Sequence, residues 1–366
     1  MIKRLAVLLV SLSLTLVASA RLINAMYAVC NDFNQLEDVV PDDLRDFDYL
    51  YFMAAPDWAS ADYSQPLDSI LHAVVSEHSY GAREATLRHL INTVHACGNR
   101  ILCSFGGVNF DKYVADPAVR AKLAAVMAAF VDRYGYDGID LDWEITITTP
   151  LHIAFMTDIR HALDALPGGE SYRLTTAVNP KRGYTSEEAR TLCDVTDWLN
   201  IMFYDMGGQL WAQKARHNAP LELMQQLTDS VWSTFPPDKL HAGLPSYGFY
   251  YEGIQPEEEI PADRTVGDYG RYFDAVELPA LLEKGWIERW DEVSKCPYYF
   301  APDGSAFVTL ESHRSLDHKL DWIKDVGFGG VFWWQYVSDY VRPAVPGEKG
   351  EHLITDHMTE AIKAAR

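Results

Sequence analysis

Three acidic residues alternate within one short apolar segment of the chain. They are Asp140, Asp142 and Glu144, in the run Asp-Gly-Ile-Asp-Leu-Asp-Trp-Glu. In a β-strand, alternate residues share one face and lie about 6.6 Å apart, so the three carboxyl groups would form a row. Neighbouring carboxyl groups do not all ionise easily, so one of them keeps a proton near neutral pH. A protonated Glu144 at the end of the row could deliver that proton to a leaving oxygen, which is general acid catalysis.

A solvated strand at the edge of a sheet is the alternative explanation for this alternation. Such a strand would not need the apolar Ile139 and Trp143 on its other face. Carboxyl groups inside a sheet are costly unless they share protons and hydrogen bonds. We therefore interpret the row as a reactive site rather than as a solvated edge.

Polar or flexible residues end two other apolar segments. Tyr204 and Asp205 follow an apolar run, where a capped strand end with a core tyrosine is the alternative. Ser104 has no His near it in sequence to activate it as a nucleophile, so we expect it to support the carboxylate row. Gly106 and Gly107 would let the backbone turn where side chains would block a cleft.

Short apolar or β-branched segments recur along the chain and predict eight strands. They are Ala25–Val29, Tyr49–Ala54, Arg100–Ser104, Gly138–Trp143, Arg173–Val178, Trp198–Phe203, Leu240–Leu244 and Gly330–Trp334. Helical patterns lie between most of them. They cover Glu84–Ala96, Ala118–Tyr134 (with Asp116 as cap and Pro117 as first residue), Leu151–Leu166 and His313–Val326.

Eight strands that alternate with helices favour a closed parallel barrel over an open doubly wound sheet. The acidic row would then end at the carboxyl ends of the strands, where barrel active sites lie. Between the seventh and eighth strands, Ile254–Asp263 predicts an exposed loop and Tyr272–Trp290 shows a helical pattern. We therefore expect an α/β chain with a single (β/α)8 barrel over residues 21–366 and a short insertion, without a second domain.

Composition and the N-terminus are typical of an exported globular protein. The 366 residues carry a net charge of −21, which disfavours nucleic acid and anionic membranes as partners. Lys3-Arg4, the apolar run Leu5–Val17 and Ala18-Ser19-Ala20 form the three parts of a secretory signal. We expect residues 1–20 to be a signal peptide, with a periplasmic or extracellular mature chain that does not insert into a membrane.

No cofactor or metal is expected. The chain has no HExxH, no Cys/His pair at metal-ligand spacing, and neither GxGxxG nor GxxxxGK[ST]. The five cysteines are an odd number, and their spacing assigns no disulfide. We expect a monomer.

The ordered set of strand ends resembles glycoside hydrolase family 18, the chitinase-like barrels. Residues 137–144 match the family's DGxDxDxE signature, and Ser104–Gly107 is similar to its SxGG motif. Met202–Asp205 is similar to its MxYD motif, while Leu244–Gly248 and Gly329–Trp334 are similar to the ends of its seventh and eighth strands. These segments occur in family order over most of the chain after residue 26.

This resemblance implies a retaining, substrate-assisted cleavage of a glycosidic bond, an exception to the two-carboxylate scheme. Glu144 would protonate the glycosidic oxygen, and the 2-acetamido oxygen of the substrate would be the nucleophile. Asp142 would orient the acetamido N–H, and Asp140 would hold Asp142 and share its proton. Tyr204 would donate a hydrogen bond to the acetamido group.

The resemblance also implies residues that bind the sugar. Asp205 would contact its hydroxyl groups, and Trp334 would stack beneath its ring, with Trp333 facing outward. The other expected contacts, taken from the motifs or from a position just after a strand end, are Met202, Ser104, Gly106, Gly107, Tyr247, Trp58 and Trp211. For Trp58 and Trp211, ordinary loop packing is an equal alternative.

The implied activity is a secreted hydrolase of β-1,4-linked N-acetylglucosamine polymers, chitin or chitooligosaccharides. An endo-β-N-acetylglucosaminidase acting on N-glycans is the alternative, because a short insertion would leave a shallow groove. A non-catalytic chitin-binding lectin is disfavoured, because lectin-like relatives typically lose the acid and Glu144 is present with its whole row.

Overall fold

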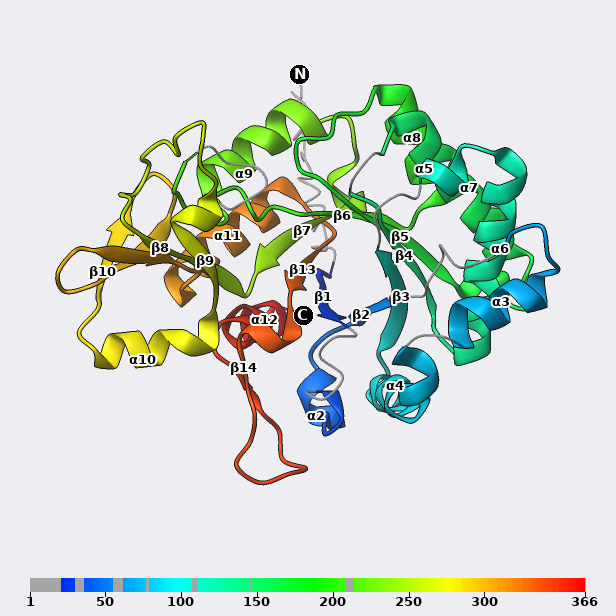
Figure 1. The fold of residues 1–366 in the computed structure, drawn as a ribbon, viewed down its shortest axis with the longest axis horizontal. Helices are drawn as coiled ribbons and strands as arrows, with labels where there is room; N and C mark the ends of the chain where they lie inside the picture. The colour runs from blue at the N-terminus through cyan, green and yellow to red at the C-terminus, as the bar shows by residue number, and fades with distance from the viewer. Residues whose placement is uncertain are drawn as a thin grey trace, which may run out of the picture.

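Eight parallel strands close into a barrel in the computed structural model, which describes residues 21–29, 36–54, 62–76, 79–106, 111–144, 147–207 and 214–365 (Figure 1). The barrel strands are β1 (Ile23–Val29), β2 (Tyr49–Ala54), β3 (Arg100–Gly106), β4 (Gly138–Asp142), β5 (Arg173–Val178), β6 (Trp198–Ile201), β7 (Leu240–Pro245) and β13 (Gly330–Trp334). Neighbours in the barrel follow chain order, and β13 closes it between β7 and β1. The predicted closed parallel barrel and its eight strands are confirmed.

Helices surround the barrel, and local sequence signals mark the ends of some of them. They are α2 (Pro41–Leu44), α3 (Leu67–Ser76), α4 (Ser79–Ala96), α5 (Asp111–Val114), α6 (Pro117–Tyr134), α7 (Thr149–Asp164), α8 (Ser186–Val195), α9 (Leu221–Leu227), α11 (His313–Val326) and α12 (Thr355–Ala364). The Asp116 carboxylate accepts from the backbone N–H of Ala118 and of Val119, which confirms the predicted cap of α6. Gly327 ends α11 in the left-handed conformation that glycine adopts without a steric penalty.

Alternation along the strands separates two apolar clusters. In β4, Ile139 and Leu141 belong to the cluster that packs against the surrounding helices. Asp140 lies between them, so its side chain points into the barrel, where Tyr27 and Tyr51 belong to the inner cluster. The barrel therefore holds the acidic row on its inner face.

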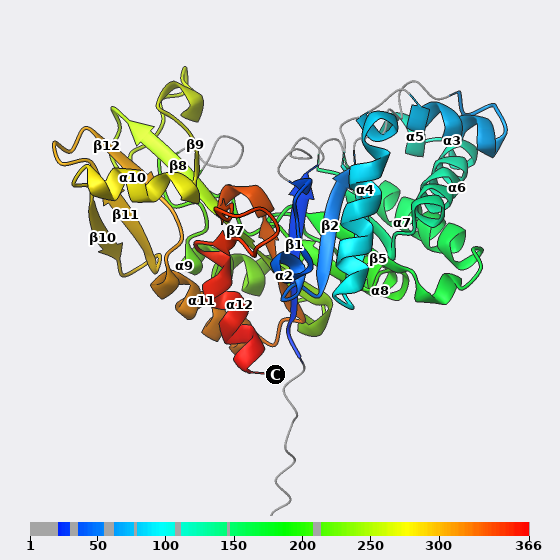
Figure 2. The ribbon, with the colours of Figure 1, turned by 90° about the horizontal axis from the view of Figure 1, so that it is seen from below.

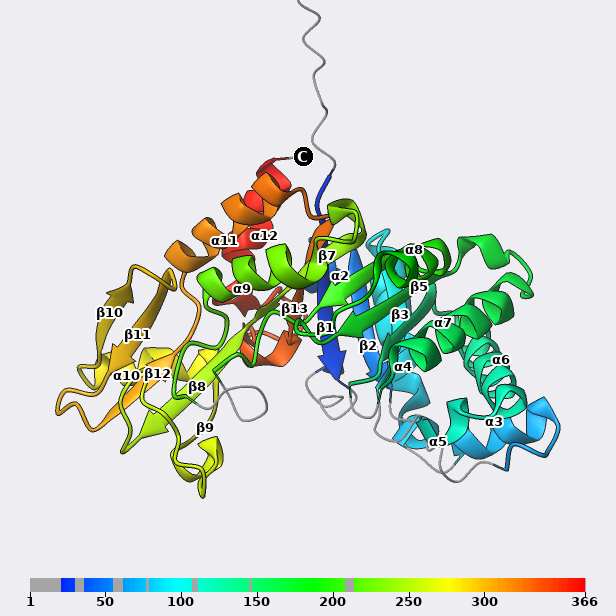
Figure 3. The same cartoon turned by 90° about the horizontal axis from the view of Figure 1, so that it is seen from above.

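The connection between β7 and β13 is larger than the expected short insertion. It forms a five-stranded antiparallel sheet with strand order β10-β11-β12-β8-β9. Its elements are β8 (Tyr247–Glu252), β9 (Gly270–Asp274), α10 (Leu278–Glu283), β10 (Ile287–Asp291), β11 (Cys296–Phe300) and β12 (Ala306–Thr309). In Figures 2 and 3 this sheet and α10, in yellow, form a lobe on one side of the barrel.

The helix predicted over Tyr272–Trp290 was wrong. That segment begins in β9, contains only the short α10 and ends in β10. Gly285 has a φ of 84° just after α10, so the chain turns there and does not continue as a helix. Ile254–Asp263 contains no helix or strand, as expected, although Ile254 and Ile260 are buried.

The chain after β13 runs through a short 3₁₀ helix, Tyr336–Ser338, and a two-stranded ribbon of β14 (Tyr340–Val341) and β15 (Glu351–His352) into α12. Within the described residues, no helix is long and apolar enough to span a membrane.

Candidate active site

Asp140 lies at the base of the acidic row, fully buried inside the barrel. Strand register places it beside Ser104 of β3 and Thr175 of β5. Its Oδ2 accepts from the hydroxyls of Tyr27 and Ser104, both at 2.7 Å. Its Oδ1 accepts from Thr175 Oγ1 at 2.5 Å and from Asn200 Nδ2 at 3.2 Å. Burial raises the pKa of Asp140, and these four hydrogen bonds to its charged form oppose that rise.

Asp142 is the next member of the row, and it has a different environment. It is buried, and its Oδ1 has no hydrogen-bond partner in the described part of the chain. Burial, then the charges of Glu144 and Asp140, raise the pKa of Asp142 well above its usual value. Asp140 accepts its four hydrogen bonds from Tyr27, Ser104, Thr175 and Asn200, and its expected hold on Asp142 stays a prediction.

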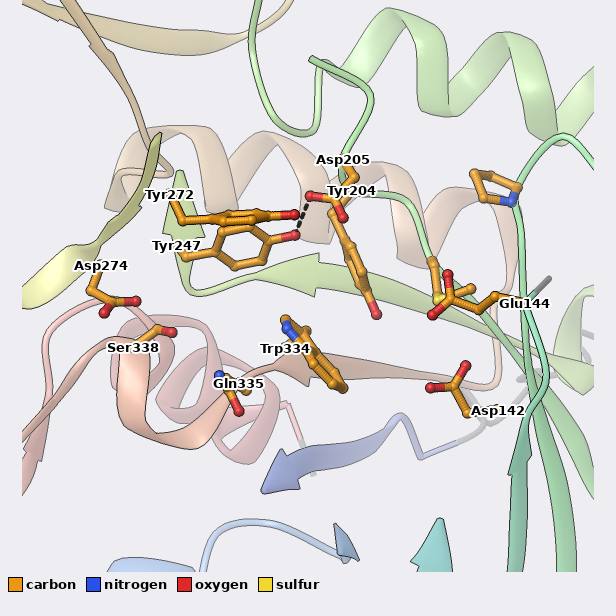
Figure 4. A pocket seen from close by; sticks show the side chains of 12 residues that line it. Asp142, Glu144, Tyr204, Asp205, Tyr247, Tyr272, Asp274, Trp334, Gln335 and Ser338 are labelled. Carbon is orange, nitrogen blue, oxygen red and sulfur yellow. Dashed lines mark hydrogen bonds between the residues drawn. The ribbon is translucent and has the colours of Figure 1, made fainter. Parts of the chain in front are cut away.

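Glu144 lies just beyond the end of β4, with its carboxyl group in a cleft (Figure 4). Partial burial, then the nearby charge of Asp205, raise the pKa of Glu144. A carboxyl group with a raised pKa at the mouth of a cleft can keep its proton and donate it, as a general acid does.

Tyr204 and Asp205 line the same cleft, just after β6. Burial, then Asp142, raise the pKa of Tyr204 well above its usual value, so its hydroxyl remains a donor. Asp205 has a φ of 56°, and its backbone N–H donates to Asn218 Oδ1 at 2.6 Å, which fixes the turn. Its carboxylate accepts a hydrogen bond from the Tyr247 hydroxyl, while burial raises the pKa of Asp205 to about 6.

Trp334, at the end of β13, lies on the floor of a cavity of about 460 Å³ (Figure 4). The neighbouring Trp333 faces the other way, into the outer core, and its indole N–H donates to Asn24 Oδ1 at 3.1 Å. The residues that line the cavity are Asp142, Glu144, Pro180, Met202, Tyr204, Asp205, Tyr247, Tyr272, Asp274, Trp334, Gln335 and Ser338.

The structure brings most of the predicted site residues together. Asp142, Glu144, Met202, Tyr204, Asp205, Tyr247 and Trp334 line the cavity, and Ser104 and Asp140 lie beneath it. Gly106 ends β3 beside the row, where an added Cβ would lie 3.6 Å from Asp142 Oδ2 and 3.3 Å from Met53 Cε. Gly107, Trp58 and Trp211 lie outside the described residues.

Sequence reasoning missed two groups of residues. Thr175 and Asn200 are polar residues within apolar strand segments, the same signal that identified Tyr204, and they could have been found that way. Tyr272 and Asp274 come from β9 of the inserted sheet and line the cavity opposite Glu144 (Figure 4). No sequence signal marked them, because their segment had been interpreted as a helix.

The inserted sheet changes the expected shape of the groove. Its Tyr247, Tyr272 and Asp274 contribute one wall of the cavity, so the argument for a shallow groove does not hold. In the described residues, no group of three or more His, Cys, Asp or Glu side chains is arranged to hold a metal ion. Cys97, Cys193 and Cys296 are free thiols, and Cys30 lies outside the described residues.

Comparisons with known proteins match most of the chain. The model of glycosyl hydrolases family 18 matches residues 73–339. Chitinase A1 of Niallia circulans is 27% identical over 284 residues, which cover 66% of this chain and 40% of that protein. An endochitinase of Manduca sexta is 27% identical over 298 residues, covering 69% of this chain and 52% of that protein. The chain thus spans about half the length of these relatives.

A solved structure shares the fold. The crystal structure of a plant class V chitinase mutant from Cycas revoluta in complex with (GlcNAc)3 superposes with a TM-score of 0.69 at 19% identity. The match covers 94% of this chain and 99% of that one.

Proposed function

The chain belongs to glycosyl hydrolases family 18, and from this premise we propose that it is a retaining glycosidase acting on β-1,4-linked N-acetylglucosamine polymers. One observation carries the proposal. Asp142 and Glu144, whose environments both favour the protonated form, face the Tyr204 hydroxyl across a cavity floored by Trp334 (Figure 4). An acid, a neutral donor and an aromatic floor suit an acetamido sugar whose glycosidic oxygen must be protonated.

The first step uses the residues of this cleft as follows. Glu144 donates its proton to the glycosidic oxygen as that bond breaks. The acetamido oxygen of the same sugar attacks the anomeric carbon, and a cyclic oxazolinium ion forms with release of the leaving alcohol. Asp142 accepts a hydrogen bond from the acetamido N–H through the carboxyl oxygen that carries no proton, and the ionised Glu144 that this step leaves offsets the positive charge. Tyr204 donates to the acetamido oxygen and holds it in line for attack.

The second step returns the site to its starting state. Glu144, now ionised, takes a proton from an incoming water molecule. The water oxygen attacks the anomeric carbon, the oxazolinium ring opens and the acetamido group is restored. Two displacements at the anomeric carbon give retention of its configuration.

A chitin-type substrate is favoured over an N-glycan. Both relatives are chitinases by name, and the Cycas revoluta structure contains (GlcNAc)3. The shallow groove that favoured an endoglycosidase is absent, because the inserted sheet supplies a wall. A non-catalytic lectin is disfavoured, because Asp140, Asp142 and Glu144 all stand in the row.

Product analysis by mass spectrometry tests the proposal. The full chain and Glu144→Gln are given defined N-acetylglucosamine oligomers and a high-mannose glycoprotein. We expect short N-acetylglucosamine products that disappear in the variant, while the variant still binds the oligomers. Cleavage of the glycoprotein alone would move the activity to the endoglycosidase. Equal products, or none, from both proteins would contradict the proposal.

We also propose export of the chain, on the basis of residues 1–20, which lie outside the described residues. N-terminal sequencing of protein expressed with its own N-terminus and recovered outside the cytoplasm tests this. The expected first residue is near Arg21, and retention of Met1 would contradict export by cleavage.

A further inference from the structure

Asn218 is buried, and its side chain joins two segments that line the cavity. Its Oδ1 accepts a hydrogen bond from the backbone N–H of Asp205 at 2.6 Å, and its Nδ2 donates to the backbone carbonyl of Tyr247 at 2.9 Å. A backbone N–H can only donate and a carbonyl can only accept, so these partners determine the orientation of the amide. One side chain therefore connects the turn after β6 with the first strand of the inserted sheet.

Asp205 and Tyr247 are also joined directly through their side chains. The Tyr247 hydroxyl donates to the Asp205 carboxylate, and both side chains line the cavity (Figure 4). With the two bonds of Asn218, this bond closes a ring of hydrogen bonds through three residues. A fully satisfied buried network of this kind rigidifies its members, because none of them can move without breaking a second bond.

The backbone of Asp205 needs such support. Its φ of 56° lies in the left-handed region, which a residue with a Cβ adopts at a cost and keeps only where its surroundings hold it. The segment of Asn218 holds it twice, because the Asn218 backbone carbonyl also accepts from the N–H of Met206 at 2.9 Å. At Gly207, an added Cβ would lie 2.2 Å from the carbonyl oxygen of Arg216, so the two segments lie directly against each other.

The start of the inserted sheet is in turn tied to the floor of the cavity. Ser246 is buried, and its backbone N–H donates to the carbonyl of Trp334 at 2.8 Å. Tyr247 follows Ser246 directly, so it is a fixed point beside the floor. Asn218 connects the turn of Asp205 to that fixed point, and without its side chain only the bond between the Tyr247 hydroxyl and the carboxylate would remain.

We propose that Asn218 is a positioning residue that holds the Asp205 carboxylate at the Tyr247 hydroxyl, in the place where the carboxylate meets the sugar bound over Trp334. Both polar atoms of the Asn218 amide are engaged by backbone groups, so it acts through Asp205 and not on the sugar itself. This inference rests on the proposed function and adds a residue from outside the cavity lining to that site.

A double-mutant cycle tests the proposal. The proteins are the full chain, Asn218→Ala, Asp205→Ala and the double variant, and the readout is kcat/KM on N-acetylglucosamine oligomers. A misplaced binding group costs up to about 10²-fold, so we expect a loss of this size in each single variant. Because Asn218 acts through Asp205, the double variant should lose no more than Asp205→Ala does. A further loss in the double variant, or an unchanged kcat/KM in Asn218→Ala, would overturn the proposal.

Asn24→Ala is the matched control. Asn24 is similarly buried, and its amide donates to Thr359 Oγ1 at 3.0 Å and accepts from the Trp333 indole at 3.1 Å. It lies near the start of β1, at the end of the barrel away from the cleft. Its loss should lower the thermal stability of the chain and leave kcat/KM unchanged, and a loss of kcat/KM equal to that of Asn218→Ala would overturn the proposal. Asn218→Ser keeps an acceptor and goes through the same cycle, so poor folding of Asn218→Ala does not decide the outcome.

Amide hydrogen exchange in the full chain reads the position of the turn without substrate. We expect the peptide that contains Asp205 and Met206 to exchange about tenfold faster in Asn218→Ala than in the wild type or in Asn24→Ala. Unchanged exchange in Asn218→Ala would overturn the positioning role. If the wild type cleaves no N-acetylglucosamine oligomer, the proposed function fails, while this exchange measurement still decides whether Asn218 holds the turn.

Discussion

Tyr204 is buried at the end of β6 among carboxyl groups, and its hydroxyl is directed into the cavity (Figure 4). Because burial and Asp142 raise its pKa well above the usual value, the hydroxyl is a neutral donor throughout the working pH range. Tyr204→Phe removes only that donor. We expect kcat to fall by about 10²-fold with KM little changed, since a donor aimed at developing charge acts mainly in the transition state. Steady-state kinetics on N-acetylglucosamine oligomers check this, and an unchanged kcat would remove Tyr204 from the mechanism.

Asp205 makes the folded chain less stable as the pH rises. Its pKa is about 6 in the folded protein, against 3.8 for a free aspartate, so the folded state binds its proton more tightly. The free energy of unfolding therefore falls as pH rises from about 4 to about 6. Above that range this carboxyl group lowers it no further. Asp205→Asn removes this cost, and we expect it to raise the free energy of unfolding by about 2 kcal/mol at pH 7.

Urea denaturation at pH 7 and at pH 4 checks the sign of this effect. The gain from Asp205→Asn should be present at pH 7 and absent at pH 4, where the folded wild-type chain is already protonated at this site. Asparagine can still accept the hydrogen bond of Tyr247, so packing is matched. A gain that is equal at both pH values would show that the carboxyl group is not responsible for it.

At the scale of elements, the strands that carry the row could be predicted and the strands of the insertion could not. The limits of β2, β5 and β13 agree with the predicted segments, because buried parallel strands are short apolar runs bounded by turn residues. In the insertion, β8 pairs with β9 and with the distant β12, so register rather than local pattern decides which residues face the cleft. For that reason the sequence identified Tyr247 but not Tyr272 or Asp274.

Strand β9 is the element whose contribution to the cleft is most directly testable. Tyr272 is 46% exposed, and its ring centroid lies 5.6 Å from that of Tyr247, on the cavity side of the sheet (Figure 4). It lies away from Glu144, so it would contact a sugar that does not react. We expect Tyr272→Ala to raise KM about tenfold with kcat unchanged, because it removes binding equal in the ground and transition states. The control is Arg271→Ala, because the Arg271 side chain packs over Tyr250 on the other face of the sheet. Equal effects of both variants would refute a specific contact between Tyr272 and the sugar.

Over the whole molecule, charge selects against anionic substrates. The chain carries a net charge of −21, and the cavity lining includes Asp142, Glu144, Asp205 and Asp274, with no Lys, Arg or His among its twelve described residues. An anionic chain entering this cleft at pH 7 meets repulsion from the ionised Asp205, whose pKa is about 6, and from the surface field. Uncharged polymers of the same size do not experience this repulsion.

Carboxymethylated and hydroxyethylated chitin oligomers of equal length separate charge from size. At low ionic strength we expect KM for the carboxymethylated substrate to be roughly tenfold higher, with kcat similar for both. The difference in KM between the two substrates should shrink as salt is raised toward 1 M, where the Debye length falls to about 3 Å. KM for the uncharged substrate should stay nearly constant. A difference in KM that does not change with salt would mean that the shape of the cleft causes the discrimination. Equal KM values at low salt would show that the acidic lining is neutralised when substrate binds.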